Sequence, residues 1–233
     1  MARRLADINK EIESESGSFR LFLENTLDRE TNGLLGNLSK KCSVYIFSGI
    51  IRNYFLGVQE TRDIDIVVDG EVEIEAFIQS FPFRKNQFGG FKVMLEKTEI
   101  DIWHLKDTWA LKHSQFTMEF ELDKYIPRTA FFNFSSVLFF YNQNRFIYTK
   151  YFSRFLRDKQ IDLVFAPNAN KPLCVVNTIY YAEKYKLRIS EKLASYIKTA
   201  YHSCHDNLDE VQLNHFGKVL YSKKNLQEKL SHL

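Results

Sequence analysis

One stretch of the chain, residues 44–69, constrains the fold more tightly than any other. It begins with the run 44–47, which is apolar and long enough for one buried strand. Ser48-Gly49 interrupts this run, and Gly57 stands where a following helix would stop. Between these two points apolar residues recur at helical spacing: Ile50, Ile51, Tyr54 and Phe55. The stretch therefore predicts a strand, a turn and a short helix.

Acidic and apolar residues alternate along the next predicted strand, residues 63–68. Because side chains alternate across a strand, Asp63 and Asp65 share one face while the isoleucines beside them take the other. Two carboxylates about 7 Å apart on one face repel each other unless a cation lies between them. Mg²⁺ that accompanies a nucleoside triphosphate commonly supplies that cation. The alternative is that the two acids only mark the solvated face of an edge strand.

A third acid repeats this pattern on a later predicted strand. Asp101, within residues 99–103, also stands between two isoleucines and would complete a cluster of three carboxylates. Upstream, Ser48-Gly49 opens a helix, where bare backbone N–H groups and the helix N-terminus suit a phosphate. Together these features favour a metal and nucleotide site.

The same residues resemble the opening motif of class II tRNA nucleotidyltransferases and bacterial poly(A) polymerases. In that family Gly-Gly-x-Val-Arg-Asp-x-Leu-Leu-Gly is followed shortly by Asp-x-Asp. Here the two elements are Ser48-Gly49-Ile50-Ile51-Arg52-Asn53-Tyr54-Phe55-Leu56-Gly57 and Asp63-Ile64-Asp65. This spacing is far more specific than a lone Asp-x-Asp. The resemblance covers roughly residues 44–200.

The resemblance implies an α+β fold, in which a nucleotidyltransferase-type mixed β-sheet is flanked by helices and followed by a smaller all-helical domain. It also implies transfer of a nucleoside monophosphate from an NTP to a hydroxyl acceptor, with release of pyrophosphate. Asp63, Asp65 and Asp101 are then the catalytic residues and the Mg²⁺ ligands. The groups expected to hold the triphosphate are the Ser48 hydroxyl, the Gly49 backbone, Arg52 and Arg62.

Residues 126–141 resemble the family's next motif, Arg-Arg-Asp-Phe-Thr-Ile-Asn-Ala. If Arg128 corresponds to its second arginine, Asn133 falls on its asparagine, and Thr129 replaces the aspartate that the family directs toward the nucleotide sugar. We expect Arg128 and Asn133 to bind the nucleotide, because a guanidinium pairs bidentately with phosphate oxygens. The alternative for Arg128 is a solvated side chain before a buried helix.

Residues 171–187 resemble the family's neck helix, whose sequence begins Asp-Pro-Leu-Arg-Ile-Leu-Arg-Ala. Pro172 and Leu173 match it, but Cys174 and Asn177 replace its first two arginines. The nucleotide-selecting Glu-Asp-x-x-Arg helix is not recognisable, and the chain stops before the body and tail that hold tRNA. We therefore expect modification of a hydroxyl other than the tRNA end, in RNA, a protein or a small molecule. A toxin or phage-defence role rests on fold-level analogy alone.

The whole chain has the composition of a soluble globular protein, apart from many Phe and Tyr residues. It contains no run of about 18 apolar residues, so no membrane partner is expected, and its N-terminus turns polar too early for a signal peptide. Cys42, Cys174 and Cys204 are odd in number and widely spaced, which favours a reducing cytoplasm over a disulfide framework. The net charge of +3 combines an acidic first half with a basic second half, which suits a metal–nucleotide site beside a phosphate-rich partner such as RNA.

We expect three units along the chain: an N-terminal helical leader (1–43), a catalytic domain (44–166) and a helical neck-like domain (167–233). In the leader, Asn32-Gly33 and Gly36-Asn37 indicate turns. The catalytic domain is expected to hold a mixed sheet of about five strands: 44–47, 63–68, 83–88, 91–96 and 98–105. Trp103 shares the face of Asp101, and we expect it to pack rather than to stack on a base.

Three hypotheses about function follow from these patterns. The first is an active metal-dependent nucleotidyltransferase, which the three retained acids favour. The second is a catalytically inactive relative that serves as a binding or regulatory module. It is suggested by the departures from the motifs, which are Ser48, Asn53, Thr129, Cys174 and Asn177. The third is an RNA-binding protein that uses the basic second half of the chain.

Overall fold

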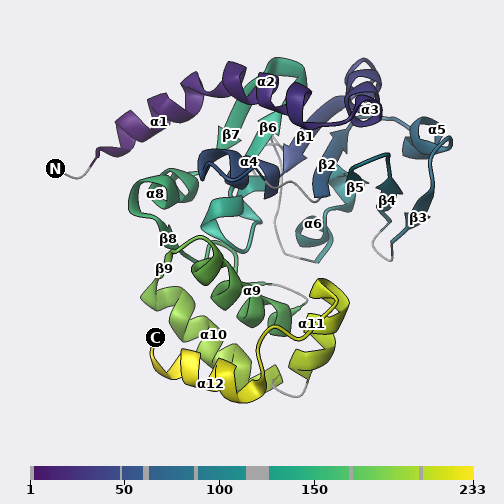
Figure 1. Cartoon of the computed structure of the whole chain (residues 1–233). Helices are drawn as coiled ribbons and strands as arrows, with labels where there is room; N and C mark the ends of the chain where they lie inside the picture. Colours follow the sequence, from purple (N-terminus) through teal and green to yellow (C-terminus); the bar gives the residue numbers. More distant parts are fainter. Residues whose placement is uncertain are drawn as a thin grey trace.

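The computed structural model describes residues 3–47, 49–59, 63–86, 89–113, 126–167, 170–204 and 207–233. Within these residues a seven-stranded sheet has the strand order β3-β4-β5-β2-β1-β6-β7 (Figure 1). In chain order the strands are β1 (Ser43–Phe47), β2 (Asp63–Asp69), β3 (Phe83–Lys85), β4 (Phe91–Met94), β5 (Glu99–His104), β6 (Val137–Phe140) and β7 (Arg145–Tyr148). β2 and β5 pair in parallel, and the other neighbouring strands pair antiparallel.

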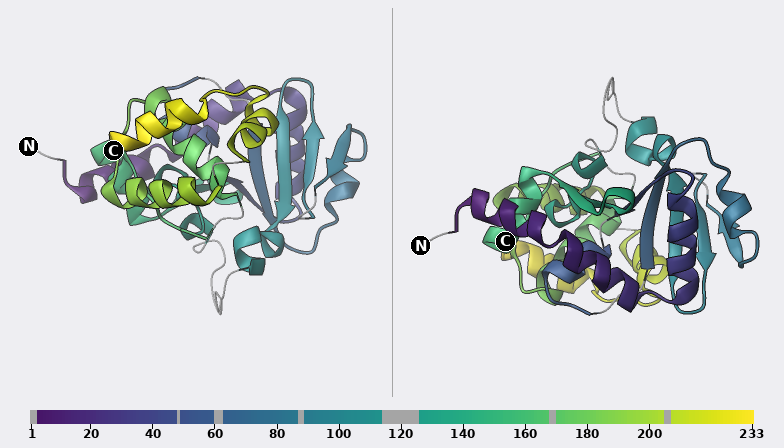
Figure 2. Two further views of the ribbon diagram at one scale, coloured as in Figure 1. Left: turned by 90° about the horizontal axis from the view of Figure 1, so that it is seen from below. Right: turned by 90° about the horizontal axis from the view of Figure 1, so that it is seen from above.

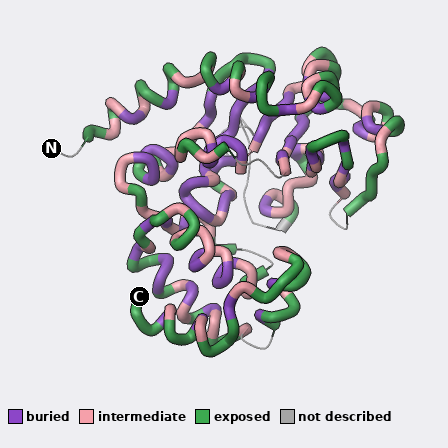
Figure 3. The backbone as a smooth tube through the Cα atoms, viewed as in Figure 1, coloured by how far each residue is buried: buried purple, intermediate pink, exposed green. Residues whose placement is uncertain are grey.

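The helices of the first eighty residues cover one face of this sheet. They are α1 (Leu5–Ser14), α2 (Ser16–Thr26), α3 (Arg29–Ser39), α4 (Gly49–Phe55) and α5 (Ile74–Ile78). Their apolar residues form one core with the strand residues that point toward them, such as Ile46, Ile66 and Ile102. In the right-hand view of Figure 2, α3 lies over the strands, and α2 and α1 lead from it toward the N-terminus. Figure 3 shows the buried residues concentrated in the strands and in the helix segments that face them. The opposite face of the sheet carries the acidic residues of β2 and β5.

Helix α3 is where the turn prediction for the leader is wrong. Asn32-Gly33 and Gly36-Asn37 lie inside the helix, which begins after Asp28, a residue whose side chain accepts a hydrogen bond from the Thr31 N–H at 2.7 Å. Leu34, Leu35 and Leu38 of this helix are buried in the core. Burial of that apolar stripe outweighs the helix-weakening effect of two glycines.

The prediction of about five strands is also wrong, because β6 joins the sheet beside β1. All four residues of β6 are buried, so its sequence lacks the alternation that identifies a half-exposed strand. Tyr45 of β1 lies opposite Phe140 of β6, and their rings stack with centroids 4.7 Å apart. β7 pairs antiparallel with β6 at the edge of the sheet.

After β7 the described chain is mainly helical, which confirms the smaller helical part that the resemblance implied. The remaining elements are α6 (Trp109–His113), α8 (Lys150–Asp158), α9 (Lys171–Lys184), α10 (Glu191–Cys204), α11 (Leu208–Phe216) and α12 (Lys223–Ser231), with the short parallel pair β8 (Gln160–Ile161) and β9 (Arg188–Ile189). Short 3-10 turns occur at Leu105–Asp107, Ile126–Arg128, Asn133–Ser135 and Tyr141–Gln143. The expected α+β class is therefore confirmed, whereas the proposed unit boundaries at 43 and 166 stay a prediction.

The N-terminal helix α1 is held by residues far along the chain. Ser153 of α8 donates a hydrogen bond to Asn9 Oδ1 at 2.7 Å, and the Tyr148 hydroxyl at the end of β7 donates to Glu13 Oε1 at 3.0 Å. Both Ile8 and Ile12 of α1 are buried in the same core. The leader is thus an integral layer of the sheet domain.

No helix in the described part of the chain is both long enough and apolar enough to cross a membrane.

Candidate active site

The acidic residues of β2 and β5 lie on the sheet face that α1 to α5 leave uncovered. Asp65 is the register partner of Asp101 in the parallel β2–β5 pair, and Asp63 is the partner of Glu99. The isoleucines that alternate with these acids are fully buried, whereas the acids are half-buried. Partners on neighbouring strands are about 4.8 Å apart. The predicted meeting of the three aspartates on one face is therefore confirmed, while their catalytic and metal-binding roles stay predictions.

This arrangement disfavours the ionised form of the Asp65 carboxyl group. Burial, followed by the nearby carboxylates of Asp63 and Asp101, raises the pKa of Asp65 to about 7, and the cations Lys92 and Arg52 partly oppose the rise. A carboxyl group with such a pKa is readily deprotonated once a further cation approaches. The site therefore favours a positively charged ligand.

Lys92 of β4 contacts the third acid, a feature that the sequence analysis did not single out. It is the register partner of Asp101, and its Nζ lies 3.1 Å from Asp101 Oδ2 and also contacts Glu99. The alternation Phe91-Lys92-Val93 could have predicted this position, because it places Lys92 on the same sheet face as the acids. Among the described residues no group of three or more His, Cys, Asp or Glu side chains is arranged to hold a metal ion.

One cavity, here called the α9 cavity, extends from the acids toward α9 and α11. It has a volume of about 370 Å³. Asp63, Asp65 and Asp101 line it together with Gly49 and Arg52 of α4, so five residues of the predicted site meet there. The far wall supplies aromatic and basic side chains: Tyr180, Tyr181, Lys184, Tyr185, His215 and Phe216. The cavity therefore offers anionic, cationic and aromatic groups to one ligand.

Arg52 is buried and held rigidly in this wall. Its Nε and Nη2 donate to Asn53 Oδ1 at 3.1 and 3.0 Å, and the Tyr185 hydroxyl donates to the same oxygen at 3.0 Å. The guanidinium lies 4.9 to 5.1 Å from the ring centroids of Phe134, Tyr181 and Tyr185. Asn53, which stands in place of the family's aspartate, thus joins α4 to α9.

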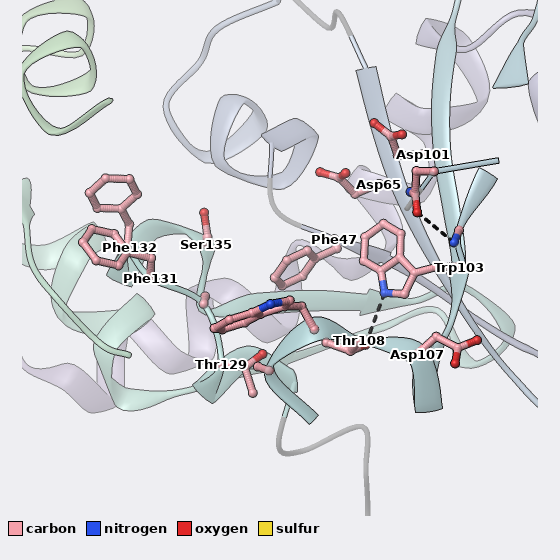
Figure 4. Close-up of a pocket in the computed structure, with 15 residues that line it drawn as sticks. Phe47, Asp65, Asp101, Trp103, Asp107, Thr108, Thr129, Phe131, Phe132 and Ser135 are labelled. Atoms are coloured by element: carbon pink, nitrogen blue, oxygen red, sulfur yellow. Dashed lines mark hydrogen bonds between the residues drawn. The ribbon is translucent and has the colours of Figure 1, made fainter. Parts of the chain in front are cut away.

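A second cavity, here called the tryptophan cavity, lies on the other side of the acids. It has a volume of about 520 Å³ and is shown in Figure 4. Asp65 and Asp101 line both cavities. The remaining described wall includes five aromatic side chains: Phe47, Trp103, Trp109, Phe131 and Phe132. Trp103 packs against the apolar cluster on this face, as predicted, and its indole N–H donates to Thr108 Oγ1 at 3.2 Å.

Of the remaining predicted site residues, Arg128 and Asn133 do not gather at the acids. Ser48 and Arg62 lie outside the described residues. Arg128 is exposed in a 3-10 turn and is absent from the described linings of both cavities. Asn133 is buried; its Nδ2 donates to the Gln160 carbonyl at 2.8 Å and its Oδ1 accepts from the Asp162 N–H at 3.0 Å. Both polar groups of Asn133 are thus bonded to the chain beside β8.

Comparison with known proteins gives structural matches only. Neither a protein-family model nor a curated protein matches the chain. A CCA-adding enzyme in complex with CTP matches with 17% identity and a TM-score of 0.66 over 91% of this chain and 53% of that chain. The Thermotoga maritima CCA-adding enzyme complexed with tRNA matches with 17% identity and a TM-score of 0.64 over 91% of this chain and 52% of that one.

A tRNA-processing enzyme with CTP matches more narrowly, with 18% identity, a TM-score of 0.54 and 72% of this chain covered against 46% of that chain. The chain spans about half the length of the CCA-adding enzymes that it matches. At these identities the likeness concerns the fold. The chain has the nucleotidyltransferase fold of the CCA-adding enzymes, as its sequence motifs predicted.

Proposed function

We propose that this protein is a Mg²⁺-dependent nucleotidyltransferase that moves a nucleoside monophosphate from an NTP to a hydroxyl group and releases pyrophosphate. The observation that supports it best is the meeting of Asp63, Asp65 and Asp101 in a cavity that Gly49 and Arg52 also line. Similar folds are found in enzymes solved with CTP, with ATP and with tRNA, which supports an NTP substrate and allows RNA as one acceptor class.

The acids fit a magnesium ion by their chemistry. Carboxylate oxygens are the ligands that Mg²⁺ prefers, and the mutual repulsion that raises the pKa of Asp65 would be relieved by a dication. Asp63 and Asp65 would hold the ion, and Asp101 would join them once the Lys92 ammonium has left its Oδ2. Bound Mg²⁺ would offset triphosphate charge and lower the pKa of the acceptor hydroxyl.

The α9 cavity suits the nucleotide. Arg52 and Lys184 supply positive charge for the phosphates, and Gly49 lets the backbone at the start of α4 approach them closely. Its tyrosines offer ring faces on which a base can stack. Departing pyrophosphate would therefore remain among cations while the α-phosphate lies at the carboxylates.

The test is transfer of label from α-³²P-NTPs in the presence of Mg²⁺ to RNA, to protein and to a low-mass cell extract. We expect transfer by the wild type and a loss of at least about a hundredfold in the double variant Asp63→Asn, Asp65→Asn. Asp69→Asn, an exposed position on the same strand, is the matched control and should retain transfer. Equal transfer by the double variant and the wild type would rule out the proposal.

The contact of Lys92 with Asp101 favours a second candidate, a nucleotide-binding module without catalysis. In that case an NTP would raise the melting temperature while no acceptor became labelled. In either role we place the protein in a reducing cytoplasm, which fits the free thiols of Cys42, Cys174 and Cys204.

A further inference from the structure

The tryptophan cavity lies where the attacking group must enter if the nucleotide occupies the α9 cavity. In a displacement at the α-phosphorus, the attacking oxygen and the leaving oxygen are in line on opposite sides. Pyrophosphate among Arg52 and Lys184 would thus leave on the α9 side of the acids. The acceptor would then come from the other side, where Asp65 and Asp101 also line the tryptophan cavity.

The described wall of this cavity includes five aromatic side chains and carries no basic side chain. Figure 4 shows Trp103 and Phe47 near the two acids, with Phe131 and Phe132 across the cavity from Trp103. None of the described residues that line it is Lys, Arg or His. Its third acid, Asp107, is paired with Lys112 at 2.9 Å. Such a wall suits flat rings and does not attract phosphate groups.

Its neutral polar groups favour ligands that donate hydrogen bonds. The Thr129 hydroxyl donates to the Ile126 carbonyl at 2.8 Å, which leaves its oxygen to accept a bond from a ligand. This residue replaces the acid of the family motif, and it lines the tryptophan cavity and not the described wall of the α9 cavity. A ligand hydroxyl or ammonium group is the natural partner of such an oxygen.

We propose that the acceptor is a small, uncharged or cationic ring compound with a hydroxyl group, bound in the tryptophan cavity; this inference rests on the function proposed above. The acceptor oxygen passes its proton to solvent water and forms a bond to the α-phosphorus, while the bond from that phosphorus to the bridging oxygen breaks and pyrophosphate leaves with the electron pair of that bond. An RNA end could stack its base on the same rings, but its phosphates need the cations that the described wall lacks.

The chain offers a direct test, because it has two tryptophans and both line this cavity. Intrinsic tryptophan fluorescence therefore reports occupancy of the cavity without any nucleotide or metal. The probes are tyramine, a cationic phenol; 3-(4-hydroxyphenyl)propionate, its anionic counterpart; a trinucleotide with a free 3′ hydroxyl; and ATP. We expect a saturable change with tyramine at millimolar or lower concentration and a much weaker response to the other three.

A second test introduces a positive charge into the wall of the tryptophan cavity. Thr129→Arg places a guanidinium in the wall and should weaken tyramine binding by about tenfold while strengthening binding of the propionate. Thr199→Arg on α10 is the matched control, because that hydroxyl also donates to a backbone carbonyl, at 3.1 Å, but is exposed and is not among the described residues that line the cavity. The control should bind tyramine like the wild type, and melting curves establish that both variants are folded.

Several results would overturn the inference. A flat tyramine titration would do so, as would tighter binding of the trinucleotide. A saturable response to ATP that tyramine competes away would make this cavity the base site of the nucleotide and would also overturn the inference. Label transfer to RNA without tyramine binding would overturn the inference and leave the proposed function standing. Tyramine binding with no label transfer to any acceptor would count against the proposed function instead.

Discussion

The Lys92 ammonium lies 3.1 Å from Oδ2 of Asp101, and both side chains are half-buried, with exposed fractions of 22% and 26%. β4 and β5 hold the two residues as register partners, so the contact is built into the sheet. A cation thus already occupies one of the places that the proposed Mg²⁺ would use. Mg²⁺ bound at this site would therefore compete with Lys92 for Asp101.

Replacing Lys92 with methionine keeps the aliphatic stem and removes the charge. Without Mg²⁺ we expect a lower melting temperature, because the carboxylates then repel each other without compensation. With Mg²⁺ we expect several-fold tighter binding and a larger thermal shift than in the wild type. Lys85→Met, on the neighbouring strand and 60% exposed, should change neither quantity. An unchanged Mg²⁺ affinity in Lys92→Met would show that the contact does not compete.

The pKa of Asp65 predicts how stability depends on pH. Burial and the adjacent acids raise that pKa from 3.8 to about 7, so the folded chain binds this proton more tightly than the unfolded chain does. The contribution to stability is full below pH 3.8 and is lost as pH rises through about 7. In metal-free buffer, Asp65→Asn should therefore gain melting temperature relative to the wild type at pH 8 and not at pH 4.

Mg²⁺ should abolish that gain, because the ion and the proton compete for the same carboxylate. Wild-type Mg²⁺ affinity should accordingly increase as pH rises through 7, and Asp69→Asn should follow the wild type throughout. Parallel melting curves for the wild type and Asp65→Asn across this range would contradict the assignment.

The buried Arg52 should be far less tolerant of lysine than the surface Arg20. Both guanidinium groups lie over aromatic rings, but Arg52 is buried and hydrogen-bonded to Asn53, whereas Arg20 lies 3.7 Å over Tyr141 with a partly exposed side chain. Arg52→Lys loses the planar fork and should cost roughly 1–3 kcal/mol of unfolding free energy. Arg20→Lys should cost less than about 1 kcal/mol. Urea unfolding measures both, and equal losses would contradict the structure.

Replacing either of two glycines with alanine should change the free energy of unfolding, with opposite signs at the two positions. A Cβ at Gly36 in α3 meets no atom within 4 Å, so Gly36→Ala should stabilise the protein by about 0.5–1 kcal/mol. A Cβ at Gly90 would lie 3.0 Å from the Cβ of Trp103 and 3.1 Å from the Ile102 carbonyl oxygen. Gly90→Ala should therefore destabilise by about 1–3 kcal/mol and shift the tryptophan emission. Unfolding curves of the two variants check both signs.

Local patterns in the sequence were sufficient to predict the acidic face. The alternation around Asp63, Asp65 and Asp101 is a property of single strands, and it persists once those strands are neighbours. The helix at Gly49 likewise follows from a turn and a short apolar period. Patterns of this kind fail where burial overrides them, as in α3 with its glycines and in the uniformly buried β6.

Contacts between distant parts of the chain could not be predicted from local sequence patterns. Tyr185 reaches Asn53 from another helix, and the tryptophan cavity combines Phe47 with Phe131, so neither relationship has a local signature. Asn133 is a case in which a local motif predicted a role that its contacts do not suggest. The motif match indicated nucleotide binding, but its side chain is hydrogen-bonded to the backbone of Gln160 and Asp162. Three-dimensional context decides which polar residue faces a ligand.

The anchoring of α1 by β7 and α8 also bears on biosynthesis. The ribosome makes α1 long before its partners, which are translated only after most of the sheet has been made. Ile8 and Ile12 consequently stay exposed to water, or bound to a chaperone, until β7 and α8 have been made. A nascent chain arrested before α8 would present these two isoleucines to the cell's quality-control machinery.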